Sequence, residues 1–444
     1  MIEIFTNPLF PVALLFILFF LDVPIALSLI GSSLYYFTFI NTAIPMRMVI
    51  QQFVTAIESF PYLAVPFFIM LGSVMNYSGI SEKLMDMAEV LAGHLKGGLA
   101  QVNCLLSALM GGISGSANAD AAMESKILVP EMLKKGLPLD FSAAVTAASS
   151  AVSPVIPPGN NLILYALIAN ISVGDMFLAG YTPGILMTAA LMITVYIISS
   201  IKGYAPSRDR RAKAKEIVLQ IAKSIWALVI PFVIILGMRL GICTPTEAGG
   251  IAVFFAIFVG VFVYKKLKWK HIPIIIKETV ISTGSVMLII ASAKVFGYYM
   301  NCERLPQIIT QALVSMTQSK YLLLFVINLM LLFICMFIEG GAALVILAPL
   351  LVPAVCSFGI DPLHFGVIFI VNIMIGGLTP PFGSMMFTVC SIVDCKFQDF
   401  VKQIWPFIVA LLIVLFAVTM SEDIALAIPK LFGYIPNHNF IIMG

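Results

Sequence analysis

The stretch Ser153-Pro154-Val155-Ile156-Pro157-Pro158-Gly159-Asn160-Asn161 lies inside a long apolar segment and decides the fold of this chain. A helix cannot continue through its prolines, because each proline lacks an N–H and fixes its own φ. Non-helical backbone inside a membrane is tolerated only where protein or a water-filled cavity surrounds it. A second break of the same kind follows at Gly376-Gly377-Leu378-Thr379-Pro380-Pro381-Phe382-Gly383-Ser384. Two broken spans in corresponding halves of a chain indicate the binding site of a secondary transporter.

Composition places the chain in a membrane. Its 444 residues are 61% hydrophobic and 11% charged, with a mean hydropathy of +1.06. A soluble protein carries about a quarter charged residues. The formal net charge of +3 gives no indication of nucleic acid. The seven cysteines show no metal-type spacing, and we interpret them as small buried hydrophobes.

The apolar runs predict an all-α polytopic fold with about ten membrane-spanning helices. They lie at residues 4–21, 23–41, 60–78, 141–170, 184–201, 225–241, 250–264, 276–300, 363–392 and 404–421. Two further apolar regions, 99–133 and 321–357, are predicted to be re-entrant hairpins. Lys and Arg in short loops mark the cytoplasmic side. The loops at Lys96, Lys134 and Lys202 therefore place the opening of the first hairpin in the cytoplasm and that of the second outside.

The two halves repeat in sequence. Matching residues recur 223 positions apart (353 − 130), as in Pro130 with Pro353, Pro157-Pro158 with Pro380-Pro381, and Pro183 with Pro406. In this register the hairpin tips at Ser116 and Glu339 are equivalent. Because the hairpins are predicted to open to opposite faces, the repeat is inverted, and inverted repeats are typical of alternating-access transporters.

The repeat predicts a division into scaffold and transport domains. Segments 43–59 and 265–282 are amphipathic and occupy equivalent places, either as interfacial connectors or as arms that link the two domains. We expect first scaffold helices and arm at 1–59, a first transport half at 60–183 with broken helix 141–170, second scaffold helices and arm at 184–282, a second transport half at 283–421 with broken helix 363–392, and a tail without an assigned role at 422–444.

The breaks and tips offer oxygen atoms for a cation. Carbonyls freed by the breaks, with the hydroxyls of Ser114 and Thr379, form oxygen cages without clustered carboxylates, which favours Na⁺ over divalent ions. Helix N-terminal amides favour anions. A substrate carboxylate is therefore expected near Ser116, Asn118, Asn160, Asn161 and Ser384. The alternative is that these Ser and Asn side chains only hold helices together.

Ionisable residues inside apolar segments are hypotheses for function by default. Asp120, Glu124, Glu339 and Lys294 are of this kind. Lys294 pairs with a carboxylate or an anionic substrate in one interpretation, and extends its ammonium to the membrane surface in the other.

Two other classes of function remain as alternatives. Gly112-Ile113-Ser114-Gly115 matches the GxSG of intramembrane serine proteases, but such an enzyme needs a histidine base within reach of the serine. The four histidines are predicted near membrane edges or outside. A stand-alone inverted-repeat ion or carboxylate transporter without a binding protein is the stronger alternative. A GxxxxGK[ST] phosphate loop is absent from the sequence, which excludes ATP hydrolysis by that route.

Four motifs in order resemble the large membrane subunit of tripartite ATP-independent periplasmic (TRAP) transporters, over nearly the whole chain. They are the tip Ser114-Gly115-Ser116-Ala117 with Asp120, the break Pro154-Val155-Ile156-Pro157-Pro158-Gly159, the turn Thr244-Pro245-Thr246-Glu247-Ala248 and the break Gly376-Gly377-Leu378-Thr379-Pro380-Pro381.

The resemblance implies a Na⁺-driven uptake system of the bacterial inner membrane with an elevator-like transport domain. Its partners are a small four-helix membrane subunit, expected here as a separate chain, and a soluble periplasmic substrate-binding protein. Substrates are organic acids, with sialic acid slightly favoured and C4-dicarboxylates next. By the family pattern, Na⁺ coordination falls on Ser114, Ser153, Ile156 and Pro158 in one half and on Gly340, Gly376 and Thr379 in the other, largely through backbone carbonyls.

Overall fold

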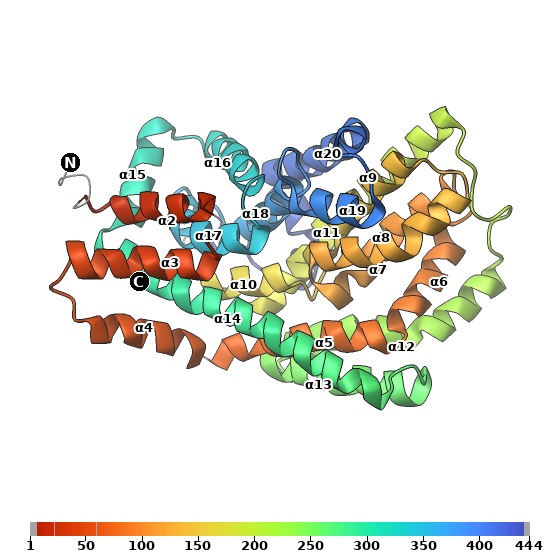
Figure 1. Ribbon diagram of the computed structural model, residues 1–444, viewed down its shortest axis with the longest axis horizontal. Helices are drawn as coiled ribbons and strands as arrows, with labels where there is room; N and C mark the ends of the chain where they lie inside the picture. The colour runs from red at the N-terminus through yellow and green to blue at the C-terminus, as the bar shows by residue number, and fades with distance from the viewer. Residues whose placement is uncertain (1–6, 22, 59, 439–444) are drawn as a thin grey trace.

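The computed structural model describes residues 7–21, 23–58 and 60–438, and all of their regular structure is helical (Figure 1). The helices of the first half are α2 (Phe10–Phe20), α3 (Ile25–Tyr35), α4 (Met46–Glu58), α5 (Ala64–Tyr77), α6 (Ile80–Ala92), α7 (Gly98–Ser114), α8 (Ala117–Lys134), α9 (Leu139–Ser150), α10 (Asn160–Ile168) and α11 (Val173–Lys202). Those of the second half are α12 (Ala214–Arg239), α13 (Pro245–Phe258), α14 (Ile272–Cys302), α15 (Leu305–Met316), α16 (Lys320–Cys335), α17 (Gly340–Ser357), α18 (Pro362–Gly376), α19 (Ser384–Val393), α20 (Phe397–Met420), α21 (Glu422–Ala425) and α22 (Ala427–Leu431).

The described residues form a multi-pass membrane protein. Six of their helices, or helices with an adjoining turn, are long and apolar enough to span a bilayer, and up to eight spans result if each of two bent pairs counts as one. The pair α5–α6 bends by 69° and the pair α9–α10 by 44°. The second bend is the predicted break, where Ser153–Val155 form a short 3-10 turn. The all-α class is therefore confirmed.

The repeat is visible element by element. Helices α8 and α17 are equivalent at both ends, since Ala117 aligns with Gly340 and Lys134 with Ser357 at the 223-residue spacing (340 − 117). The same spacing relates two π-helical segments, Tyr36–Ile40 after α3 and Val259–Val263 after α13 (259 − 36). The repeat thus extends to α3 and α13, beyond the stretch in which matching residues identify it.

Equivalent helices start at opposite ends of the molecule. Lys202 donates to Gln403 Oε1 at 3.1 Å, and Gln403 donates to Asp140 Oδ2 at 2.8 Å, so the end of α11 meets the starts of α20 and α9. At the other end, the Tyr434 hydroxyl donates to Asp361 Oδ2 at 2.9 Å, next to the start of α18.

The length of helix α11 gives the distance between these two ends of the molecule. Arg239, at the end of α12, donates to Asp175 in the first turn of α11 at 2.9 Å and also to the Phe432 carbonyl. The segment that reaches Asp361 therefore lies beside the start of α11, whereas Lys202 is its last residue. Thirty helical residues extend over about 45 Å. In Figure 1 the hairpins α7–α8 and α16–α17 accordingly lie on opposite sides of the centre.

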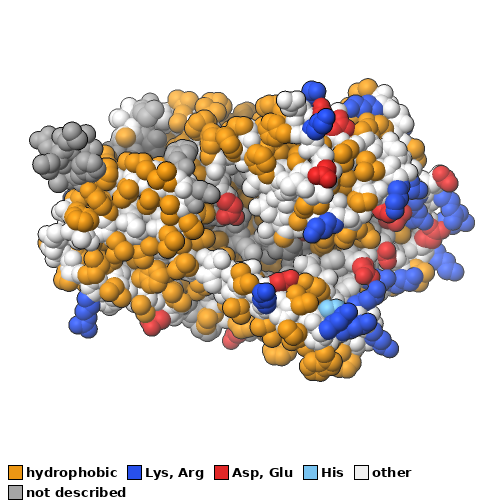
Figure 2. All heavy atoms as spheres, in the orientation of Figure 1, with side chains coloured by type: hydrophobic (Ala, Val, Ile, Leu, Met, Phe, Trp, Pro, Cys, Tyr) orange, Lys and Arg blue, Asp and Glu red, His pale blue; other side chains and the backbone are white. Residues whose placement is uncertain are grey.

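Basic side chains gather at one end of the long axis (Figure 2). The connections α6–α7 and α11–α12 meet there, as the Gly97 N–H bonded to the Tyr204 carbonyl and the Ser207 N–H bonded to the Gly93 carbonyl show. The α8–α9 connection lies near them, because the ring centroid of Phe141, in the first turn of α9, is 5.1 Å from that of Tyr204. Lys96, Lys134 and Lys135 belong to these connections. By the positive-inside rule this end faces the cytoplasm.

Several helix boundaries differ from those predicted. Helices α6 and α15 were not predicted, because they are amphipathic and carry no continuous apolar run. The second arm is not a separate element, because residues 272–302 form the single helix α14. The expected domain boundaries at 183/184 and 282/283 fall inside α11 and α14, so neither coincides with a loop.

The turn before α13 is a helix cap. Thr244 accepts from the Glu247 N–H at 3.3 Å, and Glu247 accepts from the Thr244 N–H at 2.8 Å. Two orphan donors of the helix start are thereby satisfied. The motif Thr244-Pro245-Thr246-Glu247 is therefore explained by local structure.

The C-terminal segment, to which the sequence assigned no role, folds back on the second half. Lys430 pairs with Asp423 at 2.6 Å and holds the pKa of that carboxyl below its usual value. Beyond Lys430, the Asn437 N–H and the Tyr434 hydroxyl both donate to Asp361 Oδ2. These hydrogen bonds to Asp361 hold the C-terminal segment against the start of α18.

Candidate functional site

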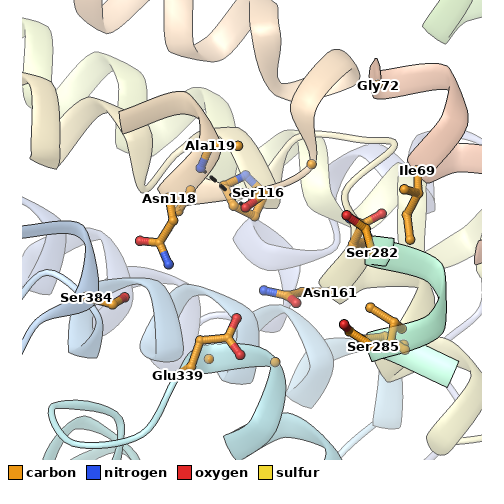
Figure 3. A pocket seen from close by; sticks show the side chains of 18 of the residues that line it. Ile69, Gly72, Ser116, Asn118, Ala119, Asn161, Ser282, Ser285, Glu339 and Ser384 are labelled. Atoms are coloured by element: carbon orange, nitrogen blue, oxygen red, sulfur yellow. Dashed lines mark hydrogen bonds between the residues drawn. The ribbon is translucent and has the colours of Figure 1, made fainter. Parts of the chain in front are cut away.

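A cavity of about 610 Å³ lies where both hairpin tips meet both breaks (Figure 3). One wall comes from the starts of α8, α10, α17 and α19. The facing wall comes from α5 and α14, with lining residues Ile69, Gly72, Ser73, Asn76, Glu278, Ile281, Ser282, Ser285, Val286, Ile289 and Ile290. The cavity thus joins parts of the chain that are more than 200 residues apart.

Four helix N-termini converge on this cavity. The first residues of α8, α10, α17 and α19 all line it. Each helix start exposes unpaired backbone N–H groups and carries roughly half a positive charge, so the four together amount to about +2. Such a convergence attracts an anion. Helix α10 and helix α19 follow directly on the breaks, which is why the prolines place two of the four N-termini there.

Glycine lets the first tip and the first break approach each other. Gly115 has φ +57°, and a Cβ there would lie 3.3 Å from the Asn160 backbone nitrogen. Within the break itself, Gly159 lets the backbone fold closely on itself, since a Cβ there would lie 2.1 Å from the Pro154 carbonyl oxygen. Ser116 then caps α8 by accepting from the Ala119 N–H at 3.5 Å (Figure 3).

Glu339 occupies the N-cap position of the equivalent helix α17 without a side-chain cap hydrogen bond, and its side chain projects into the cavity (Figure 3). Its two carboxylate oxygens lie 3.6 and 3.8 Å from the position that a Cβ on Gly341 would take, and Asn161 Oδ1 lies 3.8 Å from the same point. The expected equivalence of Ser116 and Glu339 is therefore confirmed. The tips differ in charge, because one cap is a hydroxyl and the other a carboxylate.

The facing wall contains polar residues that the sequence analysis did not assign to the site. Glu278 of α14 accepts from the Tyr77 hydroxyl of α5 at 2.7 Å and from the Ser73 hydroxyl. Ser282 and Ser285 follow Glu278 at one helical face, and both point into the cavity (Figure 3). The signal was the polar spacing i, i+4, i+7 along an otherwise apolar helix.

All five predicted substrate residues line the cavity. They are Ser116, Asn118, Asn160, Asn161 and Ser384. That these residues bind a ligand stays a prediction. They do line one common cavity, whereas side chains that only hold helices together would not need to lie in one cavity.

The predicted sodium residues lie behind this wall, with the exception of Gly340, which lines the cavity. Ser153, Ile156 and Pro158 are buried in the first break, and Gly376 and Thr379 belong to the second. Thr379 Oγ1 donates its proton to the Ile375 carbonyl at 2.7 Å, so its lone pairs remain available to a cation. The side chain of Ser114 lies outside the described part of the structure.

In the described residues, groups of three or more His, Cys, Asp and Glu side chains that could hold a metal ion are absent. Sodium binding itself stays a prediction.

The other ionisable candidates lie elsewhere. Glu124 is buried and accepts from Ser107 Oγ at 2.7 Å, and Asp120 is buried one turn before it. Lys294 lines a second cavity of about 670 Å³ at the end opposite the basic loops, beside Asn170 at the start of α11.

The protease alternative finds no support in the cavity. Within the described residues, none of the four histidines lines it. His364, the most buried, bonds the Val418 carbonyl through Nε2 at 2.8 Å. The histidine base that this class of protease needs is therefore absent from the described lining of the cavity.

Comparison with known families decides the identity of the chain. A model of the family described as tripartite ATP-independent periplasmic transporter, DctM component, matches residues 12–424. The chain belongs to this TRAP transporter family. It is a transporter permease subunit and not an enzyme.

Three relatives illustrate the range of the family. The chain is 38% identical over 420 residues to the sialic acid TRAP transporter large permease protein of Vibrio cholerae, covering 94% of this chain and 97% of that protein. It is 36% identical over 392 residues to the isethionate TRAP transporter permease protein of Oleidesulfovibrio alaskensis, covering 88% of this chain and 61% of that longer protein. It is 30% identical over 434 residues to the C4-dicarboxylate TRAP transporter large permease protein of Rhodobacter capsulatus, covering 95% and 98%.

The fold is shared more widely. The YdaH transporter of Alcanivorax borkumensis matches with a TM-score of 0.59 at 15% identity, covering 84% of this chain and 88% of that chain. At this identity the likeness concerns the fold alone.

Proposed function

We propose that this TRAP permease subunit imports an organic acid across the bacterial inner membrane, driven by Na⁺. The acid would be delivered by a periplasmic binding protein, and a small membrane subunit would complete the complex. The observation that carries this proposal is the convergence of four helix N-termini on one cavity lined by Ser, Asn and Glu side chains. A secondary transporter binds an anionic substrate group at such discontinuous helices.

The family relatives support the class of substrate. Their names specify sialic acid, isethionate and C4-dicarboxylate, all of which are acids. We favour sialic acid, with a C4-dicarboxylate next, because the chain is 38% identical to the sialic acid permease of Vibrio cholerae and 30% identical to the C4-dicarboxylate permease of Rhodobacter capsulatus.

Sodium would bind behind the tips, one ion in each half. In the first half we propose the oxygens of Ser114, Ser153, Ile156 and Pro158, and in the second those of Gly340, Gly376 and Thr379. Cations at these points would lie close to the helix N-termini that hold the acid, so that ion and substrate stabilise each other electrostatically.

The movement would be that of an elevator. Two re-entrant hairpins and two broken helices would form the transport domain, and the remaining helices would complete about ten spans in an inverted repeat. Because the expected boundaries fall inside α11 and α14, we propose that these helices, rather than loops, connect the two domains.

Reconstitution tests the proposal directly. Proteoliposomes that contain both membrane subunits are supplied with the binding protein and a labelled organic acid, with and without an inward Na⁺ gradient. Uptake is expected only with Na⁺, and Thr379→Trp is expected to abolish it by filling the second ion site. Unchanged uptake in sodium-free buffer would refute the coupling ion. Uptake by this chain alone would favour the stand-alone alternative.

A further inference from the structure

We infer that the cavity selects a singly charged acid bearing several hydroxyl or amide groups, and that Glu339 excludes a second carboxylate. This inference rests on the proposed function, because it concerns the same cavity. It separates a sugar acid from a simple dicarboxylate.

Charge is the first argument. Among the described lining residues, Glu278 and Glu339 are the ionisable side chains, and Lys, Arg and His are absent from the lining. The four helix N-termini supply roughly +2 in partial charge, and the carboxylate of Glu339 offsets about one unit of it. The two proposed Na⁺ ions would add positive charge behind this wall, so the discrimination against a second carboxylate comes from the two glutamates that line the cavity. A dicarboxylate would bring its second charge toward Glu339 or toward Glu278 on the facing wall.

Hydrogen bonding is the second argument. An ionised carboxylate accepts hydrogen bonds and cannot donate them. Glu339 extends toward the space between Asn118 and Asn161, where a ligand would lie (Figure 3). A ligand group beside Glu339 must therefore donate, as a hydroxyl or an amide N–H does. A second carboxylate would place acceptor against acceptor.

The facing wall also favours a ligand that carries hydrogen-bond donors. Ser282 and Asn76 offer donors and acceptors along one side of the cavity. Ser285 donates its proton to the Ile281 carbonyl at 3.0 Å and so offers an acceptor, as Glu278 does. A polyhydroxylated acid satisfies such a wall with its hydroxyl groups. A four-carbon dicarboxylate carries too few donors to do so.

Size is the third argument. The cavity of about 610 Å³ lies within the range of roughly 300–1,000 Å³ that is typical of sites for ligands of drug size. A four-carbon acid would leave much of it to water.

Binding to the membrane complex tests the inference apart from the binding protein, which makes its own selection. The full-length chain is purified with its small subunit, and dissociation constants are measured at saturating NaCl for N-acetylneuraminate, D-gluconate, succinate and propionate. We expect N-acetylneuraminate or gluconate to bind at least about tenfold more tightly than succinate or propionate.

The variant Glu339→Gln keeps the shape of the side chain and removes its charge. It is expected to weaken the hydroxylated acids and strengthen succinate, so that their ratio falls by about tenfold or more. Glu131→Gln is the matched control, because Glu131 pairs with Lys134 at the cytoplasmic end, outside the cavity. Its ratio should equal that of the unmodified chain.

The outcomes are distinct. Succinate binding as tightly as the hydroxylated acids would overturn the inference and leave the proposed function standing. An unchanged ratio in a folded Glu339→Gln complex would overturn the role of Glu339. Failure of every acid to bind a monodisperse complex would refute the proposed function itself.

Discussion

The two breaks use the same sequence device but differ in their surroundings. Residues 153–159 of the first break are all buried, whereas Pro381 and Phe382 of the second are exposed. Both breaks contain a cis Pro-Pro bond. The equivalent helices α11 and α20 also differ, because α11 carries Gly180 and Gly184 where α20 carries Gln403 and Phe407.

The glycines of α11 let the first break pack against the helix. A Cβ on Gly180 would lie 2.4 Å from the Val155 carbonyl oxygen, and one on Gly184 would lie 2.3 Å from Ile156 Cγ1. In the second half, Phe382 instead packs against Phe337 of the hairpin in a tilted arrangement, with ring centroids 5.3 Å apart and both side chains exposed. The first break is therefore enclosed by helices on both sides, and the second is supported mainly by its own hairpin.

The largest effect is expected at the enclosed break. Gly180→Ala places a methyl group on a backbone carbonyl that cannot move away without displacing the break, so stability should fall by about 3 kcal/mol. Thermal unfolding of the purified chain measures it. Gly297→Ala is the control, since a Cβ there meets nothing within 4 Å and should stabilise α14 by roughly 0.5–1 kcal/mol. Equal melting temperatures for the two variants would contradict the enclosed packing.

The second break is expected to be sensitive to its contact with the hairpin helix α16. A Cβ on Gly376 would lie 2.4 Å from Cys335 Cβ in α16. Gly376→Ala should therefore cost about 1–3 kcal/mol and suppress Na⁺-dependent uptake. The double variant with Cys335→Gly should recover much of the uptake, because the opposing Cβ is gone. If it recovers nothing, the contact between hairpin and break is not the cause.

A smaller effect is expected for the side chain at the second ion site. Thr379→Val removes an oxygen that is otherwise available to Na⁺, so the half-saturating Na⁺ concentration of uptake should rise by about tenfold. Thr194→Val is the control, because Thr194 makes the same type of bond, to the Ala190 carbonyl at 2.8 Å, within α11 and outside both breaks. If both variants respond to Na⁺ alike, Thr379 is not an ion ligand.

The smallest effect concerns the starts of the equivalent helices α9 and α18. Asp361 caps α18 and accepts from Tyr434, whereas the corresponding position before α9 is Pro138 and has no side-chain cap. Tyr434→Phe should lower the free energy of unfolding by about 1 kcal/mol. Tyr321→Phe serves as the control, because the exposed Tyr321 makes no hydrogen bond in the described part of the chain. A melting temperature unchanged by Tyr434→Phe would show that the C-terminal segment does not fasten α18.

Much of the cavity wall could be predicted because it depends on local chemistry. Pro158 and Pro381 lie in the breaks that follow the helix ends at Ser150 and Gly376, and new helices start just after these prolines with their N-termini directed inward. At the first hairpin tip, small residues take the place of prolines in separating two helices. These signals placed Ser116, Asn118, Asn160, Asn161 and Ser384 in one space.

The facing wall could not be predicted from the same signals. Lys277 and Glu278 interrupt the apolar run of α14, which favoured an arm followed by a separate span. In the structure α14 is continuous, and the Ser73 and Tyr77 hydroxyls, about 200 positions away in the sequence, donate hydrogen bonds to Glu278. Similarly, α6 contains the charged residues Glu82, Lys83 and Asp86, so its sequence lacks the continuous apolar run by which a spanning helix is predicted. Long-range partners, rather than local sequence, decide both cases.

Opposite orientation of the two halves is the central claim, and labelling of two equivalent exposed residues tests it most directly. Lys134→Cys, at the end of α8, and Ser357→Cys, at the end of α17, are introduced singly into a chain freed of its own cysteines and treated with a membrane-impermeant maleimide. We expect Lys134→Cys to react only from the cytoplasmic face and Ser357→Cys only from the periplasmic face. Reaction of both from the same face would contradict the inverted repeat and the cavity that depends on it.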